Sequence, residues 1–196
     1  VKLLLKIYYY KKVDLFIEEN DNMALPGVYD MFNEMWKDYQ TIHIISDTHF
    51  AEDDLKRAFP ARPSDEELVR RINTKVGKKD LLILCGDCGN LDYVKKLRGH
   101  KILIAGNHDC GMEKYKEVFD WVFSGALIIG EKLILSHEPV DVPWAYNLHG
   151  HDHQGHKRKG HKNVCADVIG YEPINLNQFL KTGPTANIYT IHRETI

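Results

Sequence analysis

Five short apolar runs in this 196-residue sequence each end in a cluster of Asp, Asn or His side chains. The run at 81–84 continues into Gly86 and Asp87, and the run at 101–105 continues into Asn107 and His108. One acidic residue after an apolar strand is unremarkable, because Asp and Asn favour turns. Five such arrangements instead favour one shared site. Its candidate side chains are Asp47, His49, Asp87, Asn107, His108, His137, His151 and His153.

These side-chain types predict a metal centre. In a crevice crowded with buried carboxylates and imidazoles, like charges would repel each other and desolvation would disfavour ionisation, and divalent cations remove both costs. At about four ligands per ion, the set is too large for one metal and suits two. Mixed oxygen and nitrogen ligands without thiolate favour Mn²⁺, Fe, Zn²⁺ or Mg²⁺ over copper or iron–sulfur clusters. The sequence has 11 histidines, several of them between 137 and 161.

The elements needed to position these side chains can be read from the apolar pattern. Expected strands at 41–46, 81–85 and 101–105 alternate with expected helices at 64–76 and 91–97, which predicts an α/β fold with parallel pairing. A weak helix is expected at 112–118. The ends of parallel strands meet in one crevice, so the candidate site should lie there. Further expected strands lie at 121–123, 126–129, 132–135, 146–148 and 163–168, followed by a helix at 175–181 and a strand at 187–191.

Residues 1–40 are expected to form an N-terminal extension with a short helix at 26–39, ahead of a single domain at 41–196. Lysines interrupt the apolar run at the start, which argues against a signal peptide, and Met23 is a candidate natural start. The expected helix carries an apolar stripe that would pack on the domain or form a partner or homo-oligomer interface.

The overall composition is that of an ordinary globular protein, with 43% hydrophobic and 28% charged residues and a net charge of −2. It gives no support to nucleic-acid binding, and no apolar stretch reaches the ~20 residues that span a bilayer. Cys85 and Cys88 form a C-x-x-C pair, typical of redox or zinc sites, but no second pair follows. We interpret them as a strand residue and a loop thiol, and expect a cytoplasmic protein.

The motifs resemble those of the calcineurin-like metallophosphoesterase superfamily, most closely its small bacterial and phage-type members. The matching blocks, in the family's order, are Asp47-x-His49, Gly86-Asp87-x-x-Asn90, Gly106-Asn107-His108-Asp109, His137 and Gly150-His151-x-His153. The resemblance implies a four-layer αββα sandwich with the active site at the C-terminal ends of the strands. It also implies a metal-dependent phosphoric ester hydrolase, with manganese as the preferred ion and Fe, Zn, Mg, Ni or Co as alternatives.

The resemblance further implies a role for each residue. Asp87 would bridge two ions, and a hydroxide between them would attack the phosphoester while His108 protonates the leaving group. Asn107 would also orient near the phosphate. The first ion would be held by Asp47, His49, Asp87 and His153, and the second by Asp87, Asn107, His137 and His151.

Two departures from the family pattern bear on the substrate. Phosphoprotein phosphatases carry Gly-Asp-x-Val-Asp-Arg-Gly, whereas Asn90 here replaces the carboxylate that would orient the catalytic His, and Leu91 replaces a phosphate-binding Arg. This favours a phosphodiesterase acting on small phosphoesters. No capping domain fits between the motifs, so only the loops at 50–63, with Arg57 and Arg62, and at 154–162 would shape an open pocket. The alternatives are a nuclease acting on DNA or RNA, and a non-catalytic binding module on the same fold.

Three features near the motifs have no assigned role in the family pattern. We expect His149 to be a strand residue or to support the ligands from behind, and Asp109 to hold the turn after His108. The loop with His156 and His161 is basic, and is interpreted as a solvated surface, with a phosphate-steering rim as the alternative.

Overall fold

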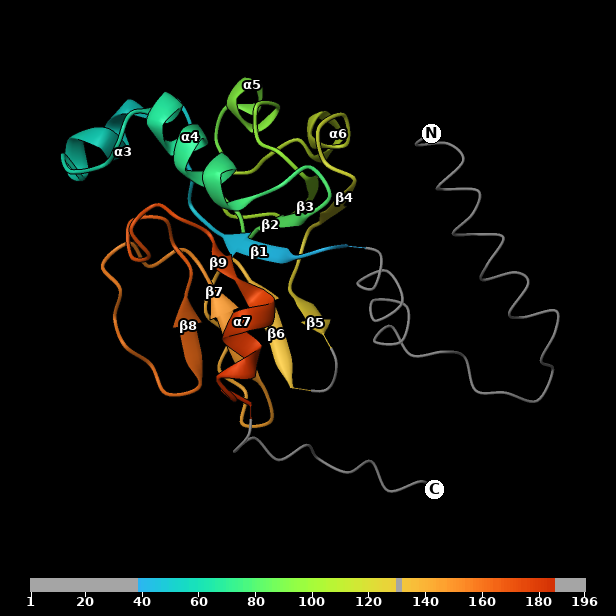
Figure 1. Cartoon of the computed structure of the whole chain (residues 1–196). Helices are drawn as coiled ribbons and strands as arrows, with labels where there is room; N and C mark the ends of the chain where they lie inside the picture. The colour runs from blue at the N-terminus through green and yellow to red at the C-terminus, as the bar shows by residue number, and fades with distance from the viewer. Residues whose placement is uncertain (1–38, 130–131, 186–196) are drawn as a thin grey trace, which may run out of the picture.

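A computed structural model describes residues 39–129 and 132–185 of the chain (Figure 1). All but the last two residues of the expected N-terminal extension, nearly all of the expected helix at 26–39, and the expected strand at 187–191 lie outside these residues. The boundary proposed at residues 40–41 therefore stays a prediction.

The first sheet holds five strands in the order β4-β3-β2-β1-β9. The strands from β4 to β1 run parallel, and β9 is antiparallel to β1. The strands β1 and β2 are buried along their whole length, as expected for branched apolar runs covered on both faces. The strands are β1 (Ile42–Ile45), β2 (Leu81–Leu84), β3 (His100–Ile104), β4 (Trp121–Phe123) and β9 (Ile174–Asn175).

Helices cover one face of the first sheet (Figure 1). The longest is α4 (Asp65–Lys75), which begins where the Ser64 hydroxyl accepts a hydrogen bond from the Glu67 amide and buries Leu68 and Ile72. Its apolar face packs on the sheet in one of the two hydrophobic cores. The shorter helices are α3 (Asp53–Ala58), α5 (Leu91–Val94) and α6 (Met112–Tyr115).

The second sheet, in the order β5-β6-β7-β8, packs against the other face of the first through a second hydrophobic core. Its parallel strands β6, β7 and β8 are joined at one edge by the antiparallel β5. Helix α7 (Leu176–Lys181) lies against β1 and β9. These two sheets with flanking helices confirm the predicted α/β fold. The strands are β5 (Leu127–Ile129), β6 (Leu133–Ser136), β7 (Tyr146–His149) and β8 (His161–Asn163).

The prediction of a strand at 163–168 was wrong, because the strand in this region, β8, lies at His161–Asn163. Strand β8 ends at Asn163, whose side-chain oxygen accepts a hydrogen bond from the Cys165 amide, and the chain then turns as the amides of Val168 and Ile169 bond to the Cys165 carbonyl. Between these points the segment bridges to Ser46 at the end of β1. This crossing brings the residues after β8 to the end of the first sheet.

The C-terminal ends of the central strands in both sheets lie together. The Asp47 amide donates to the Gly86 carbonyl, which links the loops after β1 and β2, and the Gly150 amide donates to the His137 carbonyl, which links the loops after β6 and β7. The predicted motifs all follow these strands, so the fold gathers them at one edge. No helix within the described ranges has the length and apolar character needed to cross a membrane.

Candidate metal centre

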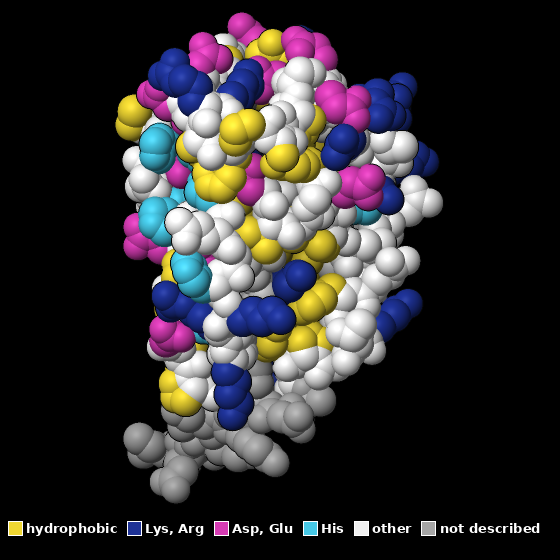
Figure 2. Space-filling view, turned by 90° about the vertical axis from the view of Figure 1, so that its left-hand side faces the viewer, with side chains coloured by type: hydrophobic (Ala, Val, Ile, Leu, Met, Phe, Trp, Pro, Cys, Tyr) yellow, Lys and Arg dark blue, Asp and Glu magenta, His cyan; other side chains and the backbone are white. Residues whose placement is uncertain are grey.

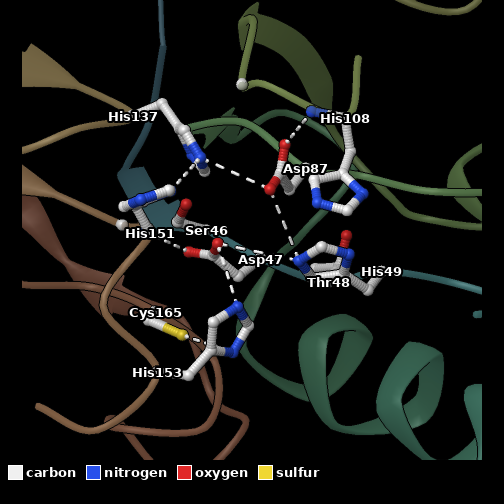
Figure 3. Close-up of polar contacts among 12 residues, drawn as sticks. Ser46, Asp47, Thr48, His49, Asp87, His108, His137, His151, His153 and Cys165 are labelled. Atoms are coloured by element: carbon white, nitrogen blue, oxygen red, sulfur yellow. Dashed lines mark hydrogen bonds and ion pairs between the residues drawn. The ribbon is translucent and has the colours of Figure 1, made fainter. Parts of the chain in front are cut away.

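The loops at this edge bring the predicted ligands into direct proximity (Figure 3). Four sets of three side chains in the described residues each place their ligand atoms within 4.8 Å of one another. Two consist of predicted ligands alone: Asp47, His49 and His153 form one, and Asp47, Asp87 and His137 form the other. One more is formed by His49, Glu52 and His108. The remaining two predicted ligands join the set that contains His137, since the Asn107 side-chain oxygen lies 2.8 Å from His137 Nε2 and 3.1 Å from His151 Nδ1.

The two carboxylates each use one oxygen for the backbone and leave the other facing the histidines. Asp87 Oδ1 accepts a hydrogen bond from the His108 amide (2.9 Å), while its Oδ2 lies 3.3 Å from His137 Nε2 and 3.5 Å from His49 Nε2. Asp47 Oδ2 accepts from the His151 amide (2.9 Å), and its Oδ1 lies 3.5 Å from His153 Nε2. The free oxygens are thus oriented towards a common centre.

The centre contains buried polar atoms without a hydrogen-bond partner. Asp47 is fully buried, and neither its Oδ1 nor the Nε2 of His49 makes a hydrogen bond. Unsatisfied buried groups of this kind are costly and rare in folded proteins. A divalent cation between these oxygen and nitrogen donors would satisfy both, so the residues present fit the metal that the motifs imply.

Three of the histidines are held from behind in the orientation a metal ligand requires. In each ring Nδ1–H donates to an acceptor outside the centre, which leaves Nε2 unprotonated in the neutral ring and pointing inward. The acceptors are Glu52 for His49 (2.8 Å), the Cys85 carbonyl for His137 (2.9 Å) and Asp167 for His153 (2.7 Å).

The backbone is strained at the ligand positions. Asp47, His49, Asp87 and His151 all have positive φ angles, of 57°, 40°, 51° and 66°. Non-glycine residues adopt such angles infrequently, and they cluster at functional sites where the surrounding structure enforces them. The strain points the four side chains of these turns into the centre.

Glycines in two of the motifs allow the carboxylates to approach closely. A Cβ on Gly106 would clash with the Asp87 side chain, and a Cβ on Gly150 would clash with Ser46 and the Asp47 carboxylate. These positions require glycine for lack of space, which accounts for their place in the motifs.

The charges of the centre shift its pKa values. Burial alone would lower the pKa of His137, but Asp87 and Asp47 raise it to about 9. Burial would raise the pKa of Asp47 and Asp87, yet the neighbouring histidines hold both below the usual range. Without metal the carboxylates are therefore charged and His137 is protonated at neutral pH, and a bound cation would take the place of that proton.

His108 lies beside the ligands and outside both sets of predicted ligands. Its amide is held by Asp87, its ring stands edge-on to His49 at 5.2 Å, and its side chain is 55% exposed. Histidines reach the surface along one edge of the molecule, next to acidic side chains and above Lys and Arg (Figure 2). The ring of His108 is therefore accessible to a solute that approaches the centre.

Several supporting residues were not identified from the sequence. Asp167 holds His153 and also accepts from Arg62 Nη1 (2.6 Å), and both side chains are almost fully buried. Arg62 further donates to the carbonyl oxygens of Asp47 and Thr48. The interpretation that Arg62 shapes the pocket was therefore wrong, because its guanidinium lies beneath the loop and neutralises Asp167.

Cys165 completes the fourth set of potential ligands with His153 and Asp167. Its sulfur lies 3.5 Å from His153 Nδ1. Burial raises the pKa of the Cys165 thiol, and the Arg62 cation already balances the charge of Asp167, so this set is a hydrogen-bonded support for His153.

Two interpretations of nearby residues are confirmed. Asp109 holds its turn by accepting from the amides of Asp87 (2.7 Å) and Gly106 (3.0 Å). Cys85 and Cys88 are both buried and unpaired, and burial raises the pKa of each thiol, which excludes the reactive thiolate of a redox pair.

His149 is a buried strand residue, as expected. Its Nδ1–H donates to the Gly150 carbonyl (2.8 Å) and its ring lies against His161, outside the two sets of ligands. His161 itself is bonded through Nε2 to Asp141 (2.7 Å), at the edge of the basic loop.

The chain is similar to known proteins over the region that forms this centre. The model of the calcineurin-like phosphoesterase family matches residues 40–175. The solved structure of a protein of unknown function from Aquifex aeolicus matches with 26% identity and a TM-score of 0.60, over 72% of this chain and 98% of that one. A nuclease from Pseudomonas putida matches with 22% identity and a TM-score of 0.44, over 57% and 61%. No curated protein matches. The chain belongs to the calcineurin-like phosphoesterase family.

Proposed function

We propose that the protein is a metal-dependent phosphohydrolase with two divalent ions, and that phosphodiesters are its substrates. The observation that carries the proposal is the convergence of Asp47 Oδ1, Asp87 Oδ2 and the inward nitrogens of His49, His137 and His153 on one centre, in which buried Asp47 Oδ1 and His49 Nε2 have no hydrogen-bond partner. Five ligand atoms of this kind without a cation would leave the interior of the protein electrostatically unfavourable.

Asp47, His49, Asp87 and His153 would hold one ion, and Asp87, Asn107, His137 and His151 the other. Asp87 is suited to the shared position because its Oδ2 faces a histidine of each set. Ions held in this way supply Lewis acidity that activates water and polarises the phosphoryl group. The nitrogen and oxygen donors suit Mn²⁺, with Fe, Zn²⁺, Mg²⁺, Ni or Co as alternatives.

His108 and Asn107 would act on the substrate itself. The exposed ring of His108 is outside both sets of predicted ligands and is held at its backbone by Asp87, so it can deliver a proton to the departing oxygen. Asn107 directs its side-chain oxygen to His137 and His151, which leaves its amide hydrogens to donate to a phosphoryl oxygen.

The preference for diesters follows from two positions, Leu91 and Arg62, that do not supply a cation to the phosphate. A phosphomonoester carries about two negative charges near neutral pH, and a diester carries one. Leu91, where a phosphatase has arginine, packs against the apolar core of the helical layer. Arg62 is committed to Asp167 and to backbone carbonyls. A substrate with a single charge therefore suits this site better.

The test compares hydrolysis of bis(4-nitrophenyl) phosphate and 4-nitrophenyl phosphate by the Mn²⁺-supplemented protein, with and without His108→Ala. We expect the diester to be the better substrate, and His108→Ala to lower kcat by roughly 10²–10⁴-fold while metal content is retained. His100→Ala is the matched control, because that exposed ring lies at the opposite end of a central strand and pairs with Asp120.

Absence of hydrolysis of both esters by wild-type protein that contains metal would contradict the proposal. An arm with single-stranded oligonucleotides tests the nuclease alternative. Cleavage of the oligonucleotides without hydrolysis of the small diester would assign the protein to that class.

A further inference from the structure

His108 lacks the orienting carboxylate that the family pattern places three residues after Asp87. The residue at that position is Asn90, and its side chain is used elsewhere, because Oδ1 accepts a hydrogen bond from the Asp92 amide (2.8 Å) and caps helix α5. An amide is also neutral, so it would not stabilise a protonated imidazole as a carboxylate does. His108, the general acid proposed for this site, therefore has no carboxylate partner at position 90.

A carboxylate from a different part of the chain, that of Glu52, lies near the ring of His108. Glu52 follows His49 by three residues and stands at the N-cap position of helix α3 without a side-chain capping hydrogen bond, and its amide donates to the His49 carbonyl. Its Oε2 lies 2.8 Å from His49 Nδ1 and 3.8 Å from His108 Nδ1. The side chain is 32% exposed, so it sits at the rim between the buried ligand and the open ring of His108.

We propose that Glu52 is the positioning residue for His108 and substitutes for the carboxylate missing at Asn90. The inference rests on the proposed function, in which His108 is the proton donor. Glu52 would accept from Nδ1–H of His108, so that the opposite nitrogen, Nε2, faces the leaving group with its proton. The 3.8 Å separation is long for a hydrogen bond, and such contacts commonly tighten when substrate is bound.

The same carboxylate oxygen already accepts from His49, so the two histidines share one acceptor. The ring of His108 stands edge-on to that of His49, and its Nδ1 lies on the side of Glu52, 3.8 Å from Oε2. Loss of the Glu52 charge should therefore affect proton donation first, while the neutral amide of Gln can still accept from His49.

The experiment measures Glu52→Gln, His108→Ala and the double variant on two phosphodiesters, one with a 4-nitrophenolate leaving group and one with a far more basic alkoxide. A general acid matters most when the leaving group is basic. General acid catalysis contributes about 10²–10⁴-fold, so we expect Glu52→Gln to lower kcat about 10-fold or more for the alkyl ester, with little change in KM and a smaller loss for the aryl ester. In the His108→Ala background it should have no further effect.

Metal content and the thermal unfolding midpoint are measured for every variant, and both should match wild type for Glu52→Gln. Asp54→Asn is the matched control, since this carboxylate lies in the adjoining helix α3, is exposed and pairs with Arg57. It should leave kcat unchanged for both esters.

Three results would overturn the inference. Wild-type activity in Glu52→Gln would show that His108 needs no carboxylate. Loss of metal, or an equal loss on both esters that adds to that of His108→Ala, would assign Glu52 to the support of His49 alone. If His108→Ala itself retains full activity on both esters, the proposed function loses its proton donor, and the positioning role fails with it.

Discussion

Oδ2 of Asp87 lies 3.3 Å from Nε2 of His137, and both side chains are almost wholly shielded from solvent. The same oxygen lies 3.5 Å from Nε2 of His49, which belongs to the other set of ligands. Asp47 is a member of both sets, and Asp87 Oδ2 faces one histidine of each, so the position of Asp87 depends on the loops after two other strands.

One of those loops contains Gly106, and its replacement should disable the centre although no ligand residue is substituted. A Cβ there would collide with the Asp87 carboxylate. We expect Gly106→Ala to lower the metal content and to reduce turnover by about 10–100-fold, as other changes behind metal ligands do. Gly125→Ala is the control, because a Cβ at Gly125 meets open space. Equal metal content and turnover in the two variants would contradict the packing argument.

Arg62 should be among the largest single contributors to stability at this edge of the fold. Its ion pair with Asp167 is buried on both sides, at 1% and 3% side-chain exposure, so removal of the guanidinium leaves an uncompensated buried charge. We expect Arg62→Ala to lower the free energy of unfolding by about 3–5 kcal/mol in urea titrations of metal-free protein. Arg57→Ala, at an exposed pair, should have no measurable effect. Similar midpoints for the two variants would be inconsistent with a buried ion pair.

The pKa of His137 predicts how pH changes the stability of metal-free protein. Histidine in the unfolded chain titrates near ~6.5, whereas the carboxylates beside His137 raise its pKa to about 9 in the fold. The native state therefore binds more protons between these values, and its free energy of unfolding falls as pH rises through that window. Below pH ~6.5 the contribution of His137 is fully present, because both states are protonated.

Urea titrations between these pH values measure the effect, with His137→Asn as the comparison. In the variant, the free energy of unfolding should fall less as pH rises, because the contribution of His137 is lost. Metal should bind more tightly to wild type as pH rises, because the ion displaces a proton. An identical pH dependence in wild type and variant would show that His137 is not charged in the metal-free centre.

The sequence could predict that these side chains would lie together, because their positions follow from strand order. Asp47, Asp87 and His137 each come within three residues after the C-terminal end of a strand, and parallel strands bring such positions together without reference to side-chain detail. Asn107 and His151 follow by the same rule. The apolar runs also placed both sheets, since branched buried segments leave few other arrangements.

The supporting residues could not be predicted in the same way. Arg62 and Asp167 are 105 residues apart and meet because the chain after β8 crosses to the end of β1. The apolar run at 163–168 predicted a strand there, so the crossing was not foreseen. Glu52 had a weak signal, its spacing of three residues from His49, but its contact with His108 depends on the turn between them. Tertiary contacts of this kind leave no periodic trace in a sequence.

The most direct test of the two-metal centre is the metal content of Asp87→Asn. Asparagine keeps an oxygen to accept from the His108 amide and removes the charge that faces both His49 and His137. Elemental analysis after saturation with Mn²⁺ and removal of free ions should give two ions per wild-type chain and at most one in Asp87→Asn, with thermal stability no longer raised by Mn²⁺ to the wild-type extent. Two ions retained by the variant, or none bound by wild type, would contradict a centre in which Asp87 joins two metals.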